Sequence, residues 1–101
     1  MAGEISLQSA RLALKQNPNI WLIDVRSTLE FQRGHIKGAT SVPLDSINKV
    51  KRLINSNEAI IFVYCKTGMR ASQAKDLLED MGYTRVTNIG GVLGWPLVQG
   101  L

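Results

Sequence analysis

Residues 59–71 read Ala-Ile-Ile-Phe-Val-Tyr-Cys-Lys-Thr-Gly-Met-Arg-Ala and join an apolar run to a turn that contains glycine. Residues 59–64 are apolar throughout and include β-branched side chains, a pattern typical of a strand buried on both faces. The run ends at Cys65, and Arg70 opens a stretch with helical spacing. The segment therefore predicts a buried strand, a tight turn and a helix in succession.

The same alternation continues along the chain. Residues 20–23 form a second apolar run that ends at Asp24, and weaker strands are predicted at 40–42 and 85–88, with a short edge strand at 4–6. Helices are predicted from Ser6 or Ser9 through Lys15, after a capping box of Ser27 and Glu30, from Asp45 or Ser46, and over 71–81 before Gly82. Strands that alternate with helices indicate an α/β fold with a parallel sheet.

Length and composition narrow the class of protein. The 101 residues, 45% hydrophobic and 20% charged, predict one globular domain over residues 1–101 and exclude an extended disordered chain. No apolar run reaches the roughly 20 residues of a membrane span, so no membrane partner is expected. The net charge of +4 favours anionic partners, but the basic residues are scattered, so no nucleic-acid partner is expected.

The single cysteine sets further limits. Cys65 has no second cysteine for an intrachain disulfide, and one histidine beside it is too little for a common zinc site, so no metal site is expected. Residues 1–4 lack the basic and apolar regions of a signal peptide, which predicts a cytoplasmic location.

Ligands of parallel sheets bind beyond the carboxyl ends of the strands, where Asp24 to Arg26 and Cys65 to Arg70 are expected to meet. The turn amides, the positive end of the following helix dipole and the cations Lys66 and Arg70 all favour the thiolate of Cys65. A cysteine inside a strand is more often an inert buried side chain. At a strand end, before a glycine turn and an arginine, the pattern instead indicates a nucleophile that solvent can reach.

Four segments carry a resemblance to a known family. Cys65-Lys66-Thr67-Gly68-Met69-Arg70-Ala71 resembles the active-site loop of the rhodanese sulfurtransferases. Asp24-Val25-Arg26 is similar to a motif after the second strand of that family, and residues 30–39 with Val42-Pro43 are similar to its N-terminal signature. Residues 90–95 resemble its C-terminal Gly-Gly…Trp segment. The segments stand in the family's order over nearly the whole chain.

The resemblance implies a rhodanese-like α/β domain with a mainly parallel sheet of about five strands and helices on both faces. Cys65 would take a sulfane sulfur from thiosulfate or a related donor and pass it, through a persulfide, to cyanide, a thiol or a sulfur-carrier protein. Such chemistry needs no metal or organic cofactor.

The residues of the loop receive separate roles in this interpretation. The amides from Lys66 through Ala71, including Gly68 and Met69, would stabilise the persulfide. Lys66 and Arg70 would bind the anionic donor, and Thr67 would donate a hydroxyl hydrogen bond to the sulfur.

Three supporting residues are expected to act through structure. Asp24 and Arg26 are predicted to form an ion pair or loop hydrogen bonds, with Arg26 shaping the pocket entrance. A Cys and a His in one chain would suit a protease pair. The resemblance instead implies that His35 fixes the turn around Gly34 and Gly38.

Two other functions are compatible with the same motifs. Some rhodanese-like domains are non-catalytic or regulatory binding modules, but these have lost the loop cysteine that is present here. Cysteine-based phosphatases and arsenate reductases of this fold have five residues between Cys and Arg, whereas four separate Cys65 from Arg70. Pro96 directly after Trp95 disfavours helical geometry there, so the last element is predicted to be short or irregular.

Overall fold

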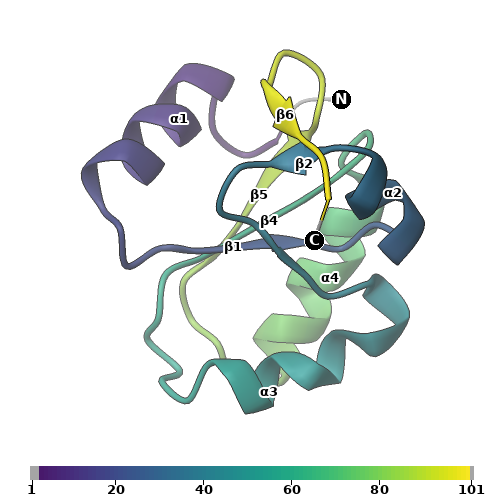
Figure 1. Ribbon diagram of the computed structural model, residues 1–101. Helices are drawn as coiled ribbons and strands as arrows, with labels where there is room; N and C mark the ends of the chain where they lie inside the picture. The colour runs from purple at the N-terminus through teal and green to yellow at the C-terminus, as the bar shows by residue number, and fades with distance from the viewer. Residues whose placement is uncertain (1–2, 101) are drawn as a thin grey trace.

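A parallel sheet forms the centre of the molecule (Figure 1). The computed structural model describes residues 3–100. Four strands lie in the order β3–β1–β4–β5, and each neighbouring pair is parallel. They are β1 (Trp21–Asp24), β3 (Thr40–Ser41), β4 (Ile61–Cys65) and β5 (Val86–Gly91). Because β4 lies between β1 and β5, both edges of the strand that ends at Cys65 are covered by neighbours.

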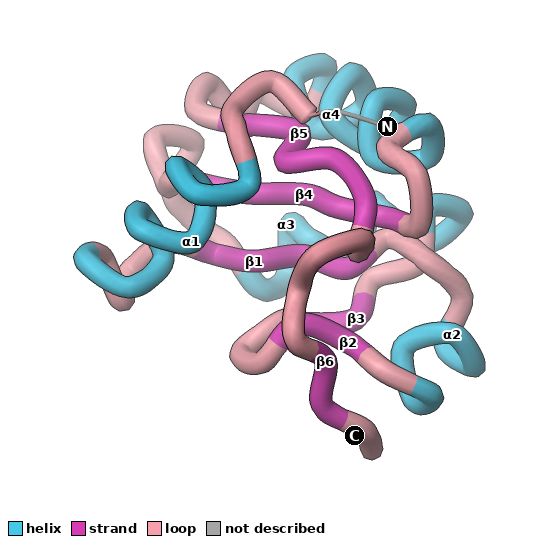
Figure 2. The backbone as a smooth tube through the Cα atoms, turned by 90° about the horizontal axis from the view of Figure 1, so that it is seen from above, coloured by secondary structure: helices cyan, strands magenta, loops and turns pink. Residues whose placement is uncertain are grey.

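A second, smaller sheet lies beside the first (Figure 2). It consists of β2 (His35–Ile36) and β6 (Leu97–Val98), which pair antiparallel. The Tyr64 hydroxyl accepts a hydrogen bond from the Ile36 N–H at 3.1 Å, so the small sheet is tied to the central strand β4.

Helices cover both faces of the parallel sheet (Figure 1). Side chains alternate between the faces of β4: Phe62 and Tyr64 pack towards α1, whereas Val63 and Cys65 pack towards α3 and α4. The helical elements are α1 (Leu7–Gln16), α2 (Thr28–Arg33), the 3₁₀ helix η1 (Leu44–Lys49), α3 (Val50–Leu53) and α4 (Met69–Asp80). Cys65 therefore lies on the face that α4 covers.

Most of the predicted elements are present. The α/β class is confirmed, and the parallel sheet has four strands among the described residues, with two further strands in the small sheet. Ser6 caps α1, and the capping box of Ser27 and Glu30 begins α2. The helix after Cys65 begins at Met69, two residues before the predicted range of 71–81, and Gly82 adopts the left-handed conformation just after it, with φ 105°.

One predicted strand is absent. Residues 4–6 form no strand: the Glu4 N–H donates to the Asn88 carbonyl at 2.7 Å, the Asn88 N–H donates to the Glu4 side chain, and Ser6 caps α1 directly afterwards. The helix predicted from Asp45 or Ser46 is present, but it starts at Leu44 as η1, is kinked at Ser46 with φ −118°, and continues as α3. The last element is short, as predicted, and is a strand of two residues.

Within residues 3–100, no helix has the length and apolar character needed to cross a membrane.

Candidate active site

Cys65 ends β4, and its sulfur lies inside the turn that follows. The Gly68 N–H donates to Cys65 Sγ at 2.9 Å. This geometry arises because Gly68 adopts φ 104°, a left-handed conformation that costs glycine little and that directs its amide back to the strand end. A sulfur that accepts an amide hydrogen bond is stabilised as the anion.

The surroundings of this sulfur differ from the prediction in two respects. Cys65 is 1% exposed and belongs to the hydrophobic core, so solvent does not reach it directly. Within residues 3–100, Gly68 is the residue whose amide is within hydrogen-bond distance of Sγ, whereas a ring of loop amides was predicted.

The remaining loop residues differ in their exposure. Lys66 and Thr67 are exposed and Met69 is 72% exposed, whereas Ala71, in the first turn of α4, is fully buried. The Thr67 hydroxyl, predicted to donate to the sulfur, makes no hydrogen bond within residues 3–100, and Thr67 forms an antiparallel bridge with Gly91. Exposed residues thus follow a buried sulfur along the chain.

Arg70 is paired with a carboxylate from another element. Its Nη1 lies 2.7 Å from Glu30 Oε1, and its Nη2 lies 3.0 Å from Glu30 Oε2. This two-pronged ion pair lowers the pKa of Glu30 to about 2, and it raises the pKa of Arg70 above its ordinary value. The sequence interpretation treated Arg70 as an unpaired cation and missed Glu30, although the capping box fixes the position of that carboxylate.

Asp24 and Arg26 form a buried ion pair at the end of β1. Arg26 Nη2 lies 2.7 Å from Asp24 Oδ2 and 2.6 Å from the Gly34 carbonyl oxygen, and the two side chains are almost fully buried. The guanidinium thus joins β1 to the turn after α2. Arg26 is 6% exposed, so it lies inside the protein and not at a pocket entrance.

His35 is a packed side chain in the small sheet. Its ring stacks on Phe31 with 3.7 Å between the ring centroids, and Nδ1–H donates to the Phe31 carbonyl at 2.8 Å. His35 is 6% exposed. No hydrogen bond joins it to Cys65 in the described part of the chain, so the structure holds no Cys–His pair there.

Two residues of β5 support the loop: Asn88, which sequence reasoning did not single out, and Gly91, which belongs to the Gly-Gly…Trp segment of the resemblance. Asn88 Nδ2 donates to the Gly68 carbonyl at 3.1 Å, and Asn88 Oδ1 accepts from the Gly90 amide at 2.8 Å. At Gly91, a Cβ atom would lie 2.1 Å from the Lys66 carbonyl oxygen, so only glycine allows the two segments to approach so closely. For Asn88, the available signal was a polar side chain two residues before a pair of glycines.

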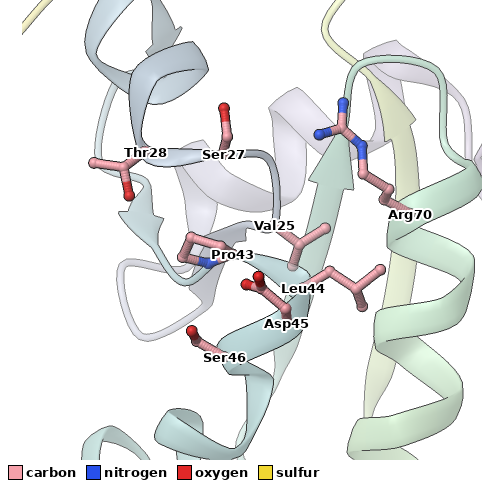
Figure 3. Close-up of a pocket in the computed structure, with 8 residues that line it drawn as sticks. All are labelled: Val25, Ser27, Thr28, Pro43, Leu44, Asp45, Ser46 and Arg70. Carbon is pink, nitrogen blue, oxygen red and sulfur yellow. The ribbon is translucent and has the colours of Figure 1, made fainter.

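A pocket of about 580 Å³ opens beside the loop (Figure 3). Its wall meets the loop at Arg70 and includes Asp45, but it does not include Cys65. The remaining lining residues are Val25, Ser27, Thr28, Pro43, Leu44 and Ser46. We place the candidate site at Cys65, the only cysteine of the chain, because its sulfur accepts the Gly68 amide at the carboxyl end of β4, and the pocket adjoins the loop at Arg70. Within residues 3–100, no three His, Cys, Asp or Glu side chains group to hold a metal ion.

Comparison with known proteins agrees with this arrangement. The thiosulfate sulfurtransferase PspE of Escherichia coli is 36% identical over 81 residues, which cover 77% of this chain and 78% of that protein. A sulfurtransferase of Allochromatium vinosum is 31% identical over 96 residues, covering 94% of this chain and 89% of its own. A solved structure, a rhodanese with anions from E. coli, superposes with a TM-score of 0.75 at 34% identity over 80% of this chain and 99% of that one.

These relatives support a sulfurtransferase role for this chain, with a sulfur donor and a sulfur acceptor as its partners in general terms. The rhodanese-like domain model matches residues 6–96. That span includes the strand, the cysteine turn and the glycine pair that were described above. The chain belongs to the rhodanese-like family.

Proposed function

We propose that the protein, acting as one domain over residues 1–101, transfers a sulfane sulfur from thiosulfate or a related donor to a thiophilic acceptor. The Cys65 thiolate attacks the outer sulfur of thiosulfate, a new S–S bond forms, the donor's S–S bond breaks, and sulfite leaves with the bonding electron pair. The acceptor, cyanide or a thiolate, then attacks the outer sulfur of the Cys65 persulfide and regenerates the thiolate. The cycle has a covalent intermediate and needs no external oxidant or reductant.

One observation supports this proposal most directly. The only cysteine of the chain ends the central strand, and the amide before a twelve-residue helix donates to its sulfur. The same amide is positioned to stabilise a negative charge on a persulfide at this end of the sheet. Gly68 and Ala71 shape the turn, while Lys66, Thr67, Met69 and Arg70 provide the surface that a donor meets.

The burial of Cys65 adds a requirement to the mechanism. Its side chain is 1% exposed, so the donor's sulfur reaches Sγ only when surrounding side chains move aside. Small side-chain rearrangements of this kind occur on the picosecond to nanosecond timescale at surfaces. Access is therefore compatible with turnover, and it favours a small donor atom at the sulfur.

Mass spectrometry of the intact protein tests the assignment. After incubation with thiosulfate we expect a gain of about 32 Da, one sulfur atom, that cyanide or a thiol removes. Cys65→Ser should abolish the gain and the release of sulfite while leaving the circular dichroism spectrum unchanged. Sulfite release by that variant at the rate of the original protein would overturn the assignment.

The same experiment separates this function from a binding module. A non-catalytic module would bind partners without gaining sulfur, so wild-type protein that shows neither the mass gain nor thiocyanate formation would favour it. A sulfur-carrier protein is also a proposed acceptor, supported by the likeness of this chain to a Bacillus subtilis protein named as a putative sulfur carrier protein, 28% identical over 93 residues. The cytoplasmic location stays a prediction, and cell fractionation tests it.

A further inference from the structure

The ion pair between Glu30 and Arg70 changes the charge that the loop offers to a donor. Both terminal nitrogens of Arg70 are engaged by the two oxygens of one carboxylate. The loop carries a second cation, Lys66, which is exposed and has no ion pair among residues 3–100. The loop therefore presents about one uncompensated positive charge, not the two that its sequence suggests.

The carboxylate is held in place independently of Arg70. The Ser27 N–H and hydroxyl each donate to Glu30 Oε1 at 3.1 Å, in the capping box that begins α2. The Ser27 cap holds the Glu30 carboxylate in one position. The Arg70 guanidinium, which pairs with that carboxylate, is therefore held in one position as well. A donor that needs all of Arg70 must displace a carboxylate that loses little entropy on binding.

In the described part of the chain, the pocket beside the loop is lined by no cationic residue other than Arg70. Among its eight lining residues, Arg70 is the cation and Asp45 is an anion, with Arg70 at the edge nearest to α4 (Figure 3). A doubly charged anion beside Arg70 would thus lie next to the Glu30 carboxylate, in a pocket that also contains Asp45. A singly charged donor meets less repulsion and still has Lys66 for its one charge.

We propose that Glu30 determines the charge class of the sulfur donor, favouring donors with a single negative charge over dianionic thiosulfate. Glu30 is a positioning residue that acts through Arg70, and the inference rests on the function proposed above. The donor class is that of monoanionic sulfane-sulfur compounds, such as thiosulfonates and organic persulfides. With a thiosulfonate, the Cys65 thiolate takes the terminal sulfur and a sulfinate leaves with the electron pair.

Two donors that differ in charge provide the test. Thiosulfate is a dianion, and methanethiosulfonate replaces one charged oxygen with a methyl group while keeping the sulfur to be transferred. We define a ratio as kcat/KM for thiosulfate divided by kcat/KM for methanethiosulfonate, measured at constant ionic strength. Glu30→Gln removes the charge but keeps an oxygen for the capping box.

We expect Glu30→Gln to raise this ratio about fivefold, since the second charge of thiosulfate then interacts with an uncompensated guanidinium. Glu30→Ala should move the ratio in the same direction, and thermal unfolding establishes that each variant is folded. Glu58→Gln is the matched control: it makes the same change in net charge on an exposed residue before β4, at the opposite end of the strand from Cys65. It should leave the ratio within about twofold of the original.

A ratio that stays unchanged or falls in both Glu30 variants overturns the proposal, as does an equal rise in Glu58→Gln. Binding of inorganic sulfate, followed by the NMR shift of the Arg70 Nε–H, gives a readout that needs no turnover. Sulfate should bind Glu30→Gln more tightly than the original protein. If neither donor transfers sulfur but sulfate binding still tightens, the proposed function fails and the charge effect of Glu30 remains.

Discussion

Asp24 and Arg26 form an ion pair that is almost completely shielded from solvent. Asp24 is 0% exposed, and Arg26 donates to it through both its backbone amide and its guanidinium. The same guanidinium reaches the Gly34 carbonyl, so one side chain satisfies acceptors on two segments. Such a buried ion pair adds little to the free energy of unfolding, because burial removes both charges from water. Removing one partner lowers the stability strongly, because the other charge then stays buried without a partner.

Removal of Arg26 should therefore destabilise the fold strongly. We expect Arg26→Ala to lower the free energy of unfolding by about 3–5 kcal/mol, measured by urea denaturation. The double variant Asp24→Asn with Arg26→Gln, which replaces both ions by neutral hydrogen-bonding groups, should recover part of this loss. A loss below about 1 kcal/mol in Arg26→Ala would mean that water reaches Asp24.

Gly91 is the point at which β5 approaches the cysteine loop most closely. A methyl group there would lie 2.1 Å from the Lys66 carbonyl oxygen, and that oxygen now accepts from the Val92 amide at 3.3 Å. We expect Gly91→Ala to cost about 1–3 kcal/mol of stability and to lower kcat/KM for sulfur transfer, because the backbone on which Cys65 depends must shift.

Gly34→Ala is the control for Gly91→Ala. The backbone of Gly34 is extended, with φ 167°, and an added Cβ would touch only the Leu97 side chain, at 3.4 Å. Its cost should stay below about 1 kcal/mol, with sulfur transfer unchanged. Equal losses in the two variants would show that the close contact at Lys66 has no special role.

The residues of the site were predictable to different degrees from the sequence. The position of Cys65 at a strand end follows from a single apolar run and a glycine, which are local signals. Its burial, the pairing of Arg70 with Glu30 and the support from Asn88 depend on contacts between segments distant in the chain. Such contacts arise from the packing of elements, which no local pattern encodes.

Helix α2 shows how a short element can gain stability from one side chain. Its six residues are too few for a stable isolated helix, and Glu30 supplies both the capping box and the bridge to α4. Pairing with Arg70 lowers the pKa of Glu30 from 4.5 to about 2, so the folded protein favours its charged form. The resulting stability is present above the unfolded value and is lost as the pH falls through about 2.

Glu30→Gln should abolish this pH-dependent contribution. We expect the original protein to exceed the variant in free energy of unfolding by about 1–2 kcal/mol at pH 6, discounted because the carboxylate is partly exposed. The difference should shrink as the pH falls from about 4.5 towards 2, as followed by urea denaturation at each pH. A difference that is independent of pH would assign the stabilisation to packing and not to charge.

The helices and strands were predicted best where a single local sequence pattern, such as an apolar run or a capping box, is clear. The buried strand at 59–64 and the capping box of α2 follow from composition and spacing alone. Residues 4–6 looked like a strand, but the side chain of Glu4 pairs with Lys75 and with the Asn88 amide, which replaces a strand's backbone pairing. The pairing of β2 with β6 joins segments far apart in the chain, and strands of two residues carry too little pattern to be recognised.

A hydrogen bond links the two sheets of the molecule. The central strand β4 contributes Tyr64, which is fully buried, and the hydroxyl of Tyr64 accepts from the Ile36 amide of β2. Burial raises the pKa of Tyr64, so the hydroxyl stays protonated at any ordinary pH. Since β2 in turn pairs with β6, this one hydroxyl joins the small sheet to the core that positions Cys65.

Tyr64→Phe should loosen the small sheet while leaving the parallel sheet intact. The Ile36 amide would lose its buried acceptor, so we expect a loss of about 1–2 kcal/mol and faster hydrogen exchange at Ile36. Tyr83→Phe is the matched control, because its hydroxyl donates to the Ile54 carbonyl at 2.7 Å on the α3 side of the sheet. Tyr83→Phe should lower the stability without a selective increase in hydrogen exchange at the Ile36 amide. If the Ile36 amide of Tyr64→Phe exchanges as slowly as in the original protein, pairing with β6 alone holds the small sheet in place.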